Sequence, residues 1–509
     1  MVFSMMMVLA MVALVVALVG GLVVVMTRKG KGKEKKVPKV LGSMSETLAK
    51  MNCAETPWFL LDLAKQLAPG ERVYRLALPF FVPRTFVLAD PMVAQAVLRS
   101  KSVDKPAVYS EFAALTMRQT LFTRPSTDPM QPLSRKGTAP AFSARRVNSS
   151  VRSSDFKSVL KDVFDVLDLG HPFDPAELLT MATIDIIGKV ALGGIDFGTV
   201  RSLLVQDKDA SSDEKEANLG ATFLKELPVA LREYSMRRMF NPLRKYYARF
   251  TDAGARAEEA KVKLWAVAEQ IMRASKASTE TSSTGEGCAI LDHLRANRNF
   301  ESDADRIAEI QMYLIAGHDT TGYSLAWTAY EVAKRGPTFA AMLRDEIKAG
   351  VHLTKQDSLF ERTCKEAMRL WPVAAMGPFR EIVDPDGLHV KTDACEFDLP
   401  YKSTCVIPML PILRSAPGIK DPDTFDPDRW LDPDQAQPLK DSFFPFSLGS
   451  RNCLGMALAQ AEHRHLFAAI IERYDLSLVK DFTPDFFLTL KPNGGLLKAT
   501  KVLADSPAF

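Results

Sequence analysis

The stretch Phe446–Gly455 (FSLGSRNCLG) places a single cysteine, Cys453, in a loop that two glycines bracket. A helical pattern begins directly after this loop, at Met456. The loop has five characteristic residues, Phe446, Gly449, Arg451, Cys453 and Gly455. The probability that they assemble by chance in a chain of this length is on the order of one in ten thousand, given ordinary composition. A buried cysteine is usually a small apolar side chain, but this pattern indicates a chemical role for Cys453.

A lone thiolate limits what this loop can bind. Glycines let the backbone approach a flat ligand closely. A helix that starts after the cysteine, together with the loop N–H groups, stabilises a thiolate. One thiolate cannot form a closed zinc or iron–sulfur site, because those sites need several protein ligands. A haem iron needs only one, so the loop favours a haem-thiolate site.

Residues 302–334 carry the pattern of one long helix. Ser302 is a suitable N-cap, acidic residues follow in the first turn, and Gly336-Pro337 ends the pattern. Such a helix is about 50 Å long at 1.5 Å per residue, so we expect it to cross the whole domain.

The centre of this helix, residues 316–321 (AGHDTT), contains Gly317, and glycine is a poor helix former. Thr320 and Thr321 each stand four residues after a carbonyl to which their hydroxyls can donate, which bends a helix. The neighbouring His318 has no obvious partner. Residues that disfavour helix in the middle of a core helix indicate a function. The alternative is that residues 316–321 form a polar turn that faces solvent.

Two weaker patterns lie further along the chain. Glu366 and Arg369 stand three residues apart in a helical stretch, so both side chains occupy one helix face. Arg429 lies in a turn rich in proline and aspartate. Taken alone, a surface ion pair worth at most about 1 kcal/mol explains the first pattern equally well.

Composition excludes several classes of protein. The chain has 509 residues, of which 47% are hydrophobic and 25% charged, which is the globular average and excludes a disordered, collagen-like or mucin-like chain. Charge is spread along almost the whole length, which excludes a transporter with many membrane spans. Six scattered cysteines without a CxxC pair do not form a disulfide scaffold and favour a reducing compartment.

The N-terminus has the pattern of a membrane anchor. Residues 5–26 are uncharged and apolar, and as a helix they would span roughly 33 Å, enough for a hydrocarbon core of about 30 Å. Seven basic residues and one acidic residue follow in residues 28–39, which leaves 58 basic and 60 acidic residues in the rest of the chain. Since a nucleic-acid-binding protein carries its basic excess on the folded body, this distribution removes the main support for nucleic-acid binding. The basic flank predicts a cytosolic body, and a cleaved signal peptide is the alternative. We therefore expect an anchor (1–26), a basic linker (27–40) and a catalytic domain (41–509).

The patterns and their order are similar to those of the cytochrome P-450 family of haem-thiolate monooxygenases, over nearly all of residues 41–509. The resemblance implies a mainly α fold with small β-sheets (α+β). It also implies haem b (iron protoporphyrin IX) held between the long central helix and the cysteine loop.

Carried over residue by residue, the resemblance makes Cys453 the axial iron ligand and places Asp319 and Thr320 at the dioxygen pocket as catalytic residues. Glu366, Arg369 and Arg429 would form a buried ion-pair cluster. The family usually has a tryptophan four residues before Arg135, where this chain has Gln131, and a surface charge is the alternative role for Arg135. The other residues implied to bind the cofactor are Arg135, Ala316, Gly317, Arg380, Phe446, Gly449, Arg451 and Gly455.

The resemblance further implies insertion of one oxygen atom from dioxygen into an apolar, lipid-, sterol- or isoprenoid-like substrate. A separate NADPH-dependent reductase, with cytochrome b5 as a further candidate, would supply electrons, since the chain has no GxGxxG motif. The expected location is the endoplasmic reticulum membrane, in contact with lipid, and a plastid or other organelle envelope is the alternative. The rival functions are a haem-thiolate isomerase or dehydratase that needs no external electrons, and a non-catalytic, membrane-tethered haem-binding protein.

Overall fold

The computed structural model describes residues 38–502, except residues 52–53, 69, 81, 205–217, 238–242, 280–289 and 394. The described residues belong to one compact unit. The predicted anchor and nearly all of the basic linker lie outside the described residues. Within the described part, no helix has both the length and the apolar composition that crossing a bilayer requires.

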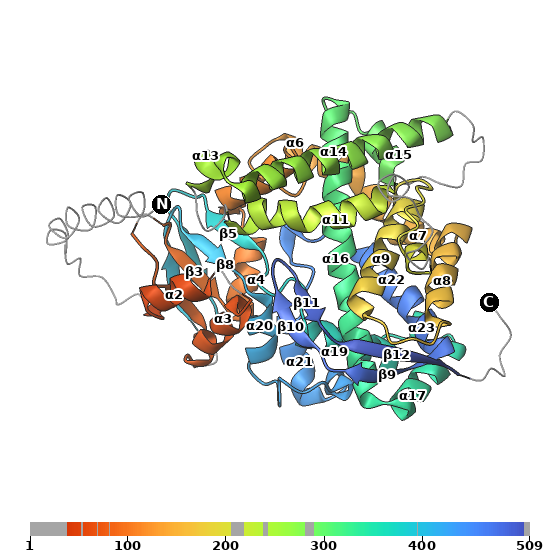
Figure 1. The fold of residues 1–509 in the computed structure, drawn as a ribbon. Coiled ribbons are helices and arrows are strands. Elements are labelled where there is room, and N and C mark those ends of the chain that lie inside the picture. Colours follow the sequence, from red (N-terminus) through yellow and green to blue (C-terminus); the bar gives the residue numbers. More distant parts are fainter. Residues whose placement is uncertain are drawn as a thin grey trace, which may run out of the picture. The chain divides into compact units, whose positions relative to one another are not determined.

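A six-stranded sheet occupies one end of the body (Figure 1), with strand order β1-β2-β3-β8-β5-β4. Its first strand begins at Lys39, just before the predicted domain boundary at residue 41. The short strand β4 pairs with β5 antiparallel, Asp104 opposite Glu381, and so brings the segment after β4 next to Arg380. The strands are β1 (Lys39–Leu41), β2 (Val73–Leu76), β3 (Thr85–Leu88), β4 (Val103–Asp104), β5 (Phe379–Ile382) and β8 (Thr404–Val406).

The long helix α16 (Asp303–Arg335) runs through the middle of the body (Figure 1). It begins as expected, because Ser302 caps it in a reciprocal capping box with Asp305. It ends before Gly336, whose φ of 80° suits glycine, and Pro337 starts the next helix. The helix α9 (Pro175–Ile186) packs tightly on it: a Cβ at Gly322 would come within 2.6 Å of Thr180. The middle of α16 is therefore fixed in the core.

The remaining elements surround α16, and the predicted mainly α fold with small sheets is confirmed. In Figure 1, α11 and α14 cross α16 on one side. Their bounds are α2 (Met44–Lys50), α3 (Thr56–Lys65), α4 (Pro91–Arg99), α5 (Ser110–Leu115), α6 (Met130–Thr138), α7 (Ala144–Ser150), α8 (Ser154–Leu167), α11 (Leu219–Leu231), α13 (Arg244–Tyr247), α14 (Asp252–Thr279), α15 (Ile290–Ala296), α17 (Pro337–Lys348), α18 (Val351–Thr354), α19 (Leu359–Leu370), α20 (Met409–Ser415), α21 (Pro433–Ser442), α22 (Met456–Glu462) and α23 (Ala468–Arg473). In the part of the chain that the structure describes, three two-stranded sheets pair β6 (Leu388–Lys391) with β7 (Glu396–Leu399), β9 (Tyr474–Lys480) with β12 (Leu496–Lys501), and β10 (Thr483–Phe486) with β11 (Leu490–Asn493).

Candidate functional site

The cysteine loop is closed by its own backbone. The N–H of Cys453 donates to the carbonyl of Phe446 at 2.8 Å. Gly449 has a φ of 75°, and a Cβ there would lie 2.3 Å from the carbonyl oxygen of Leu98 in α4, so this position requires glycine. Cys453 is exposed, and α22 begins three residues later. The loop therefore presents the thiol at a fixed place.

The surroundings of the Cys453 thiol act on its ionisation in both directions. Desolvation raises the pKa of the thiol, whereas the N–H groups of Gly455 and Met456 and the charge of Arg135 lower it. Desolvation is the larger effect. The start of the helix therefore stabilises the thiolate as expected, but not enough to lower the pKa of the thiol below its ordinary value. A bound metal cation is what deprotonates such a sulfur, because a cysteine must lose its proton to become a ligand.

The centre of α16 stays helical and lines a cavity. Thr320 Oγ1 donates to the carbonyl of Ala316 at 2.7 Å, as predicted; for Thr321 no such bond is found among the described residues. Ala316 is exposed although it stands halfway along a core helix, and a Cβ at Gly317 would come within 2.7 Å of Ile187. The cavity is lined by Thr320, Thr321, Ser324, Met368, Pro372, Val373, Ala374, Met409, Pro445, Phe446, Ala459 and His463. Residues of α16 and of the cysteine loop therefore line the same cavity.

His318, for which the sequence indicated no partner, contacts Asp319. Its Nε2 lies 3.0 Å from Asp319 Oδ1, and its Nδ1 lies 2.8 Å from the carbonyl oxygen of Leu314. Burial alone would lower the pKa of His318, but the neighbouring Asp319 carboxylate outweighs it and raises that pKa. Burial likewise opposes ionisation of Asp319, but the charge of His318 and hydrogen bonds from His318 and Tyr323 lower its pKa. Both shifts favour an imidazolium–carboxylate pair.

Three arginines predicted to contact a cofactor converge with a lysine that the sequence analysis missed. Arg135 donates to the Asn452 carbonyl and side chain at 2.9 and 2.7 Å, and so rests on the cysteine loop. Arg380 is 3% exposed and donates to the carbonyl of its own neighbour Phe379. Arg451 donates to the carbonyls of Leu121 and Arg124 at 3.0 and 2.8 Å. We call Lys105, Arg135, Arg380 and Arg451 the cation cluster.

The fourth member, Lys105, lies over the rings of Tyr109 and Phe122, 4.4 and 3.9 Å from their centroids. Its pKa is lowered well below the ordinary value, first by desolvation and then by the charges of Arg451 and Arg380. Desolvation also lowers the pKa of Arg451, to about 10. Besides desolvation, repulsion from the other cations of the cluster contributes to lowering both pKa values.

The cation cluster lacks anions of its own. The charge of Asp104 acts on three of the four cations. Its oxygens, however, already accept hydrogen bonds from the backbone N–H groups of Lys105, Ser126 and Thr127. Among the described residues, no carboxylate forms an ion pair with any of the four cations. Gln131, one turn before Arg135 in α6, is buried with its Nε2 unpartnered. Cations without a carboxylate partner, together with the unpartnered Gln131 Nε2, fit a ligand that carries carboxylates, such as the two propionates of haem.

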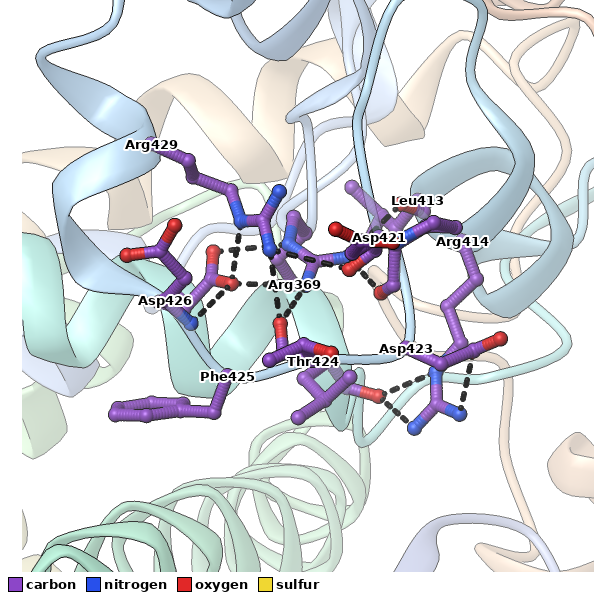
Figure 2. A network of polar contacts seen from close by, with 12 residues as sticks. Arg369, Leu413, Arg414, Asp421, Asp423, Thr424, Phe425, Asp426 and Arg429 are labelled. Atoms are coloured by element: carbon purple, nitrogen blue, oxygen red, sulfur yellow. Dashed lines mark hydrogen bonds and ion pairs between the residues drawn. The ribbon is translucent and has the colours of Figure 1, made fainter.

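Glu366, Arg369 and Arg429 form a second group, fully buried and well bonded. Glu366 accepts from Arg369 at 2.8 and 2.9 Å and from Arg429 at 2.8 Å. Figure 2 shows both guanidinium groups directed at the carbonyl of Thr424, at 3.2 and 2.9 Å. We call these three residues the Glu366 cluster. It joins α19 to the turn that carries Arg429.

Comparison with known proteins agrees with this geometry. The sequence model of the family described as cytochrome P450 matches residues 83–502. Cytochrome P450 monooxygenase poxM of Penicillium oxalicum is 26% identical over 63% of this chain and 60% of its own length. Cytochrome P450 4F12 of Homo sapiens is 33% identical over 33% of each chain, and the mitochondrial sterol 26-hydroxylase of Oryctolagus cuniculus 31% over 35% of each. The chain thus spans between a third and three fifths of the length of these curated relatives.

A solved structure gives the same fold. The cytochrome P450DA heme domain superposes with a TM-score of 0.74 at 19% identity, over 92% of this chain and 99% of that domain. Because the family match covers most of the described body, the chain belongs to the cytochrome P450 family.

Proposed function

We propose that this protein is a haem-thiolate monooxygenase that inserts one oxygen atom of dioxygen into an apolar substrate. The observation that carries the proposal is the cation cluster beside an exposed, loop-fixed Cys453: one thiol for iron, and unpaired cations for propionates. Cys453 would ligate the iron, and Arg135, Arg380 and Arg451, with Lys105 and Gln131, would bind the propionates. The bound haem supplies the activation of dioxygen, which a thiolate ligand favours.

Thr320 and Asp319 would act on protons at the cavity. The hydrogen of Thr320 Oγ1 is committed to the Ala316 carbonyl, so its lone pairs are left to accept a hydrogen bond from a ligand in the cavity. Asp319, the next residue, is 25% exposed at its side chain and paired with His318. Positioned proton transfer of this kind contributes about 10²–10⁴-fold to a rate.

The substrate we propose is lipid-, sterol- or isoprenoid-like. Apart from Thr320, Thr321, Ser324 and His463, the side chains around the cavity are apolar, and Val373 and Ala374 belong to a run without charge. Such walls bind ligands by burial of apolar surface rather than by hydrogen bonds. Two relatives are named for similar chemistry, the sterol 26-hydroxylase and a leukotriene-B4 omega-hydroxylase of Mus musculus.

Electrons would come from a separate NADPH-dependent reductase, with cytochrome b5 as a further donor, at the endoplasmic reticulum membrane. The apolar sequence of residues 5–26 supports membrane attachment. So do the exposed side chains of Leu243, Tyr246 and Phe250, which alternate with arginines and lysine around α13. Flotation of the full chain with phosphatidylcholine–phosphatidylserine vesicles tests this, and a chain that stays at the bottom of the gradient would contradict it.

Two measurements test the proposed reaction. The reduced protein should show a thiolate-type, red-shifted Soret band with carbon monoxide, and Cys453→Ser should abolish it. Turnover of lipid-like compounds should then require reductase and NADPH. Product formation without them would establish the isomerase or dehydratase reaction instead, and haem binding without any turnover would establish a haem carrier. Thr320→Ala should consume NADPH without matching product.

A further inference from the structure

The ring of His318 is held so that one of its protons is fixed. Its Nδ1 lies 2.8 Å from the carbonyl oxygen of Leu314, one turn earlier in α16. A carbonyl oxygen only accepts, so Nδ1 must carry hydrogen. The ring is 3% exposed, and its edge packs on Phe223 of α11 with centroids 5.3 Å apart. The tautomer of His318 is therefore set by its surroundings.

The other ring nitrogen then shares a proton with Asp319. Nε2 lies 3.0 Å from Asp319 Oδ1. If neither atom held hydrogen, two lone pairs would face each other at this distance. The pair therefore carries one proton, as imidazolium and carboxylate or as imidazole and carboxylic acid. His318 and Asp319 together form a store for a single proton, directly beside Thr320.

Charged and titratable groups from the packed elements act on this store. Tyr323 of α16 donates to Asp319, and Lys491 of β11 lowers the pKa of Asp319 further. Asp174, which caps α9, and Asp485 of β10 act on Tyr323. From α9, Thr183 Oγ1 donates to the His318 carbonyl at 2.9 Å and fixes the backbone there. The surroundings favour the charged form of the pair.

We propose that His318 is a positioning residue for oxygen activation: it holds the proton that Asp319 passes toward Thr320. This inference rests on the proposed monooxygenase function. The proton moves from Nε2 to Asp319 Oδ1, leaving neutral imidazole. Asp319, whose side chain is the more exposed of the two, then gives it up to a basic oxygen of the ligand in the cavity that Thr320 lines. No electrons move within the pair. Repulsion between the two unprotonated atoms, Nε2 and Oδ1, then favours uptake of another proton from solvent, which restores the imidazolium.

Nitrogen-15 NMR tests the pair without any turnover. The chain has seven histidines, and the diamagnetic ferrous carbon monoxide complex of the ¹⁵N-histidine-labelled holoprotein allows their nitrogens to be observed. His318 should keep both ring protons at pH values where the histidines with a lowered pKa, which are His293, His352, His463 and His465, have become neutral. Its signal should vanish in His318→Gln and titrate at lower pH in Asp319→Asn. An unprotonated Nδ1 at His318, or neutrality at pH 6, would overturn the proposal.

Coupling measured against pH tests the role. His318→Gln keeps a donor for Asp319 but cannot store a proton, so product formed per NADPH should fall about tenfold or more, as for a lost outer-shell partner, and lose its dependence on pH. His389→Gln is the matched control, since His389 pairs with Asp398 at 2.7 Å on the surface. An unchanged pH profile in His318→Gln would refute the role. An intact carbon monoxide spectrum in each variant separates this failure from failure of the proposed function.

Discussion

The Glu366 cluster buries two arginines and the cation cluster buries Arg380, but the two clusters differ in what surrounds the guanidinium groups. In the Glu366 cluster, one carboxylate accepts from two arginines, from Trp430 Nε1 at 3.0 Å and from the backbone N–H of Asp426 at 3.1 Å. In the cation cluster, Arg380 is equally buried, yet its hydrogen bonds go to Tyr109 and to its own chain neighbour. The arginines of the Glu366 cluster are paired with a carboxylate of the protein, whereas the cations of the other cluster are not.

This difference separates two uses of a buried arginine. A charge that is paired and fully hydrogen-bonded holds the fold together, and removing its partner is costly. A buried charge without a counter-ion destabilises the free protein. Such a charge is retained where a ligand supplies the missing anion, so the balance of charges distinguishes the structural cluster from the binding cluster.

The largest expected effect comes from breaking the complete cluster. Glu366→Gln leaves two buried guanidinium groups without a counter-charge and should lower the free energy of unfolding by about 3–5 kcal/mol. Urea unfolding followed by circular dichroism measures this, and the loss should be similar with and without haem. Glu361→Gln, on the same helix but in a surface pair with Lys365 at 3.2 Å, should change stability by less than about 1 kcal/mol. Equal effects in the two variants would remove the distinction between the clusters.

The cation cluster should respond with the opposite sign in the free protein. Arg380→Met removes a desolvated charge that has no carboxylate partner, so the apoprotein should be as stable as the parent or more so. Haem binding should weaken by about 1.5–3 kcal/mol, the contribution of hydrogen bonds to charged groups, or roughly 10- to 150-fold in affinity. Haem transfer to an acceptor apoprotein measures the affinity, and urea unfolding measures the stability.

Arg344 provides the control for that experiment. It is buried too, but it pairs with Asp475 at 2.6 Å and donates to the carbonyl of Ile471 at 3.1 Å. Arg344→Met should therefore destabilise apoprotein and holoprotein alike and leave haem affinity unchanged. If Arg380→Met behaves in the same way, the cation cluster is a structural group and not a propionate site.

The parts of this site that follow from sequence are those with a local signature. The N-cap Ser302, the stop at Gly336 and the loop around Cys453 are each encoded within a few neighbouring residues, so the long helix and the loop were predictable. The spacing of Glu366 and Arg369 places them on one helix face, but their burial with Arg429 depends on the turn around Thr424, which spacing alone does not give.

Lys105 and the partner of His318 were not predictable for physical reasons. Lys105 reaches the arginines because the two-residue strand β4 pairs with β5, and a strand that short leaves no periodic pattern. Adjacent residues on a helix do not normally face each other, so Asp319 was not an evident partner for His318. Contacts between distant segments, and unusual local geometry, need the folded structure.

The smallest effect, and the most direct on the charge argument, concerns Lys105. A lysine whose pKa is lowered in the folded protein binds fewer protons there than in the unfolded chain. Stability should therefore rise with pH across the window from that lowered pKa up to the ordinary value of 10.5. Lys105→Met should remove this slope in the apoprotein. Near neutral pH the net change should stay within about 1 kcal/mol, because the lost cation–π contacts offset the relieved repulsion.

Bound haem should have the same effect on the slope as the substitution, for a different reason. Two propionates beside Lys105 would restore the pKa of its ammonium group toward the ordinary value, so holoprotein with Lys105 should show little pH dependence from this group. Urea unfolding of both forms between pH 7 and pH 10.5, with and without Lys105→Met, separates the cases. A slope that persists in the holoprotein would mean that the anions of the ligand do not reach Lys105. The cation cluster would then consist of the three arginines alone.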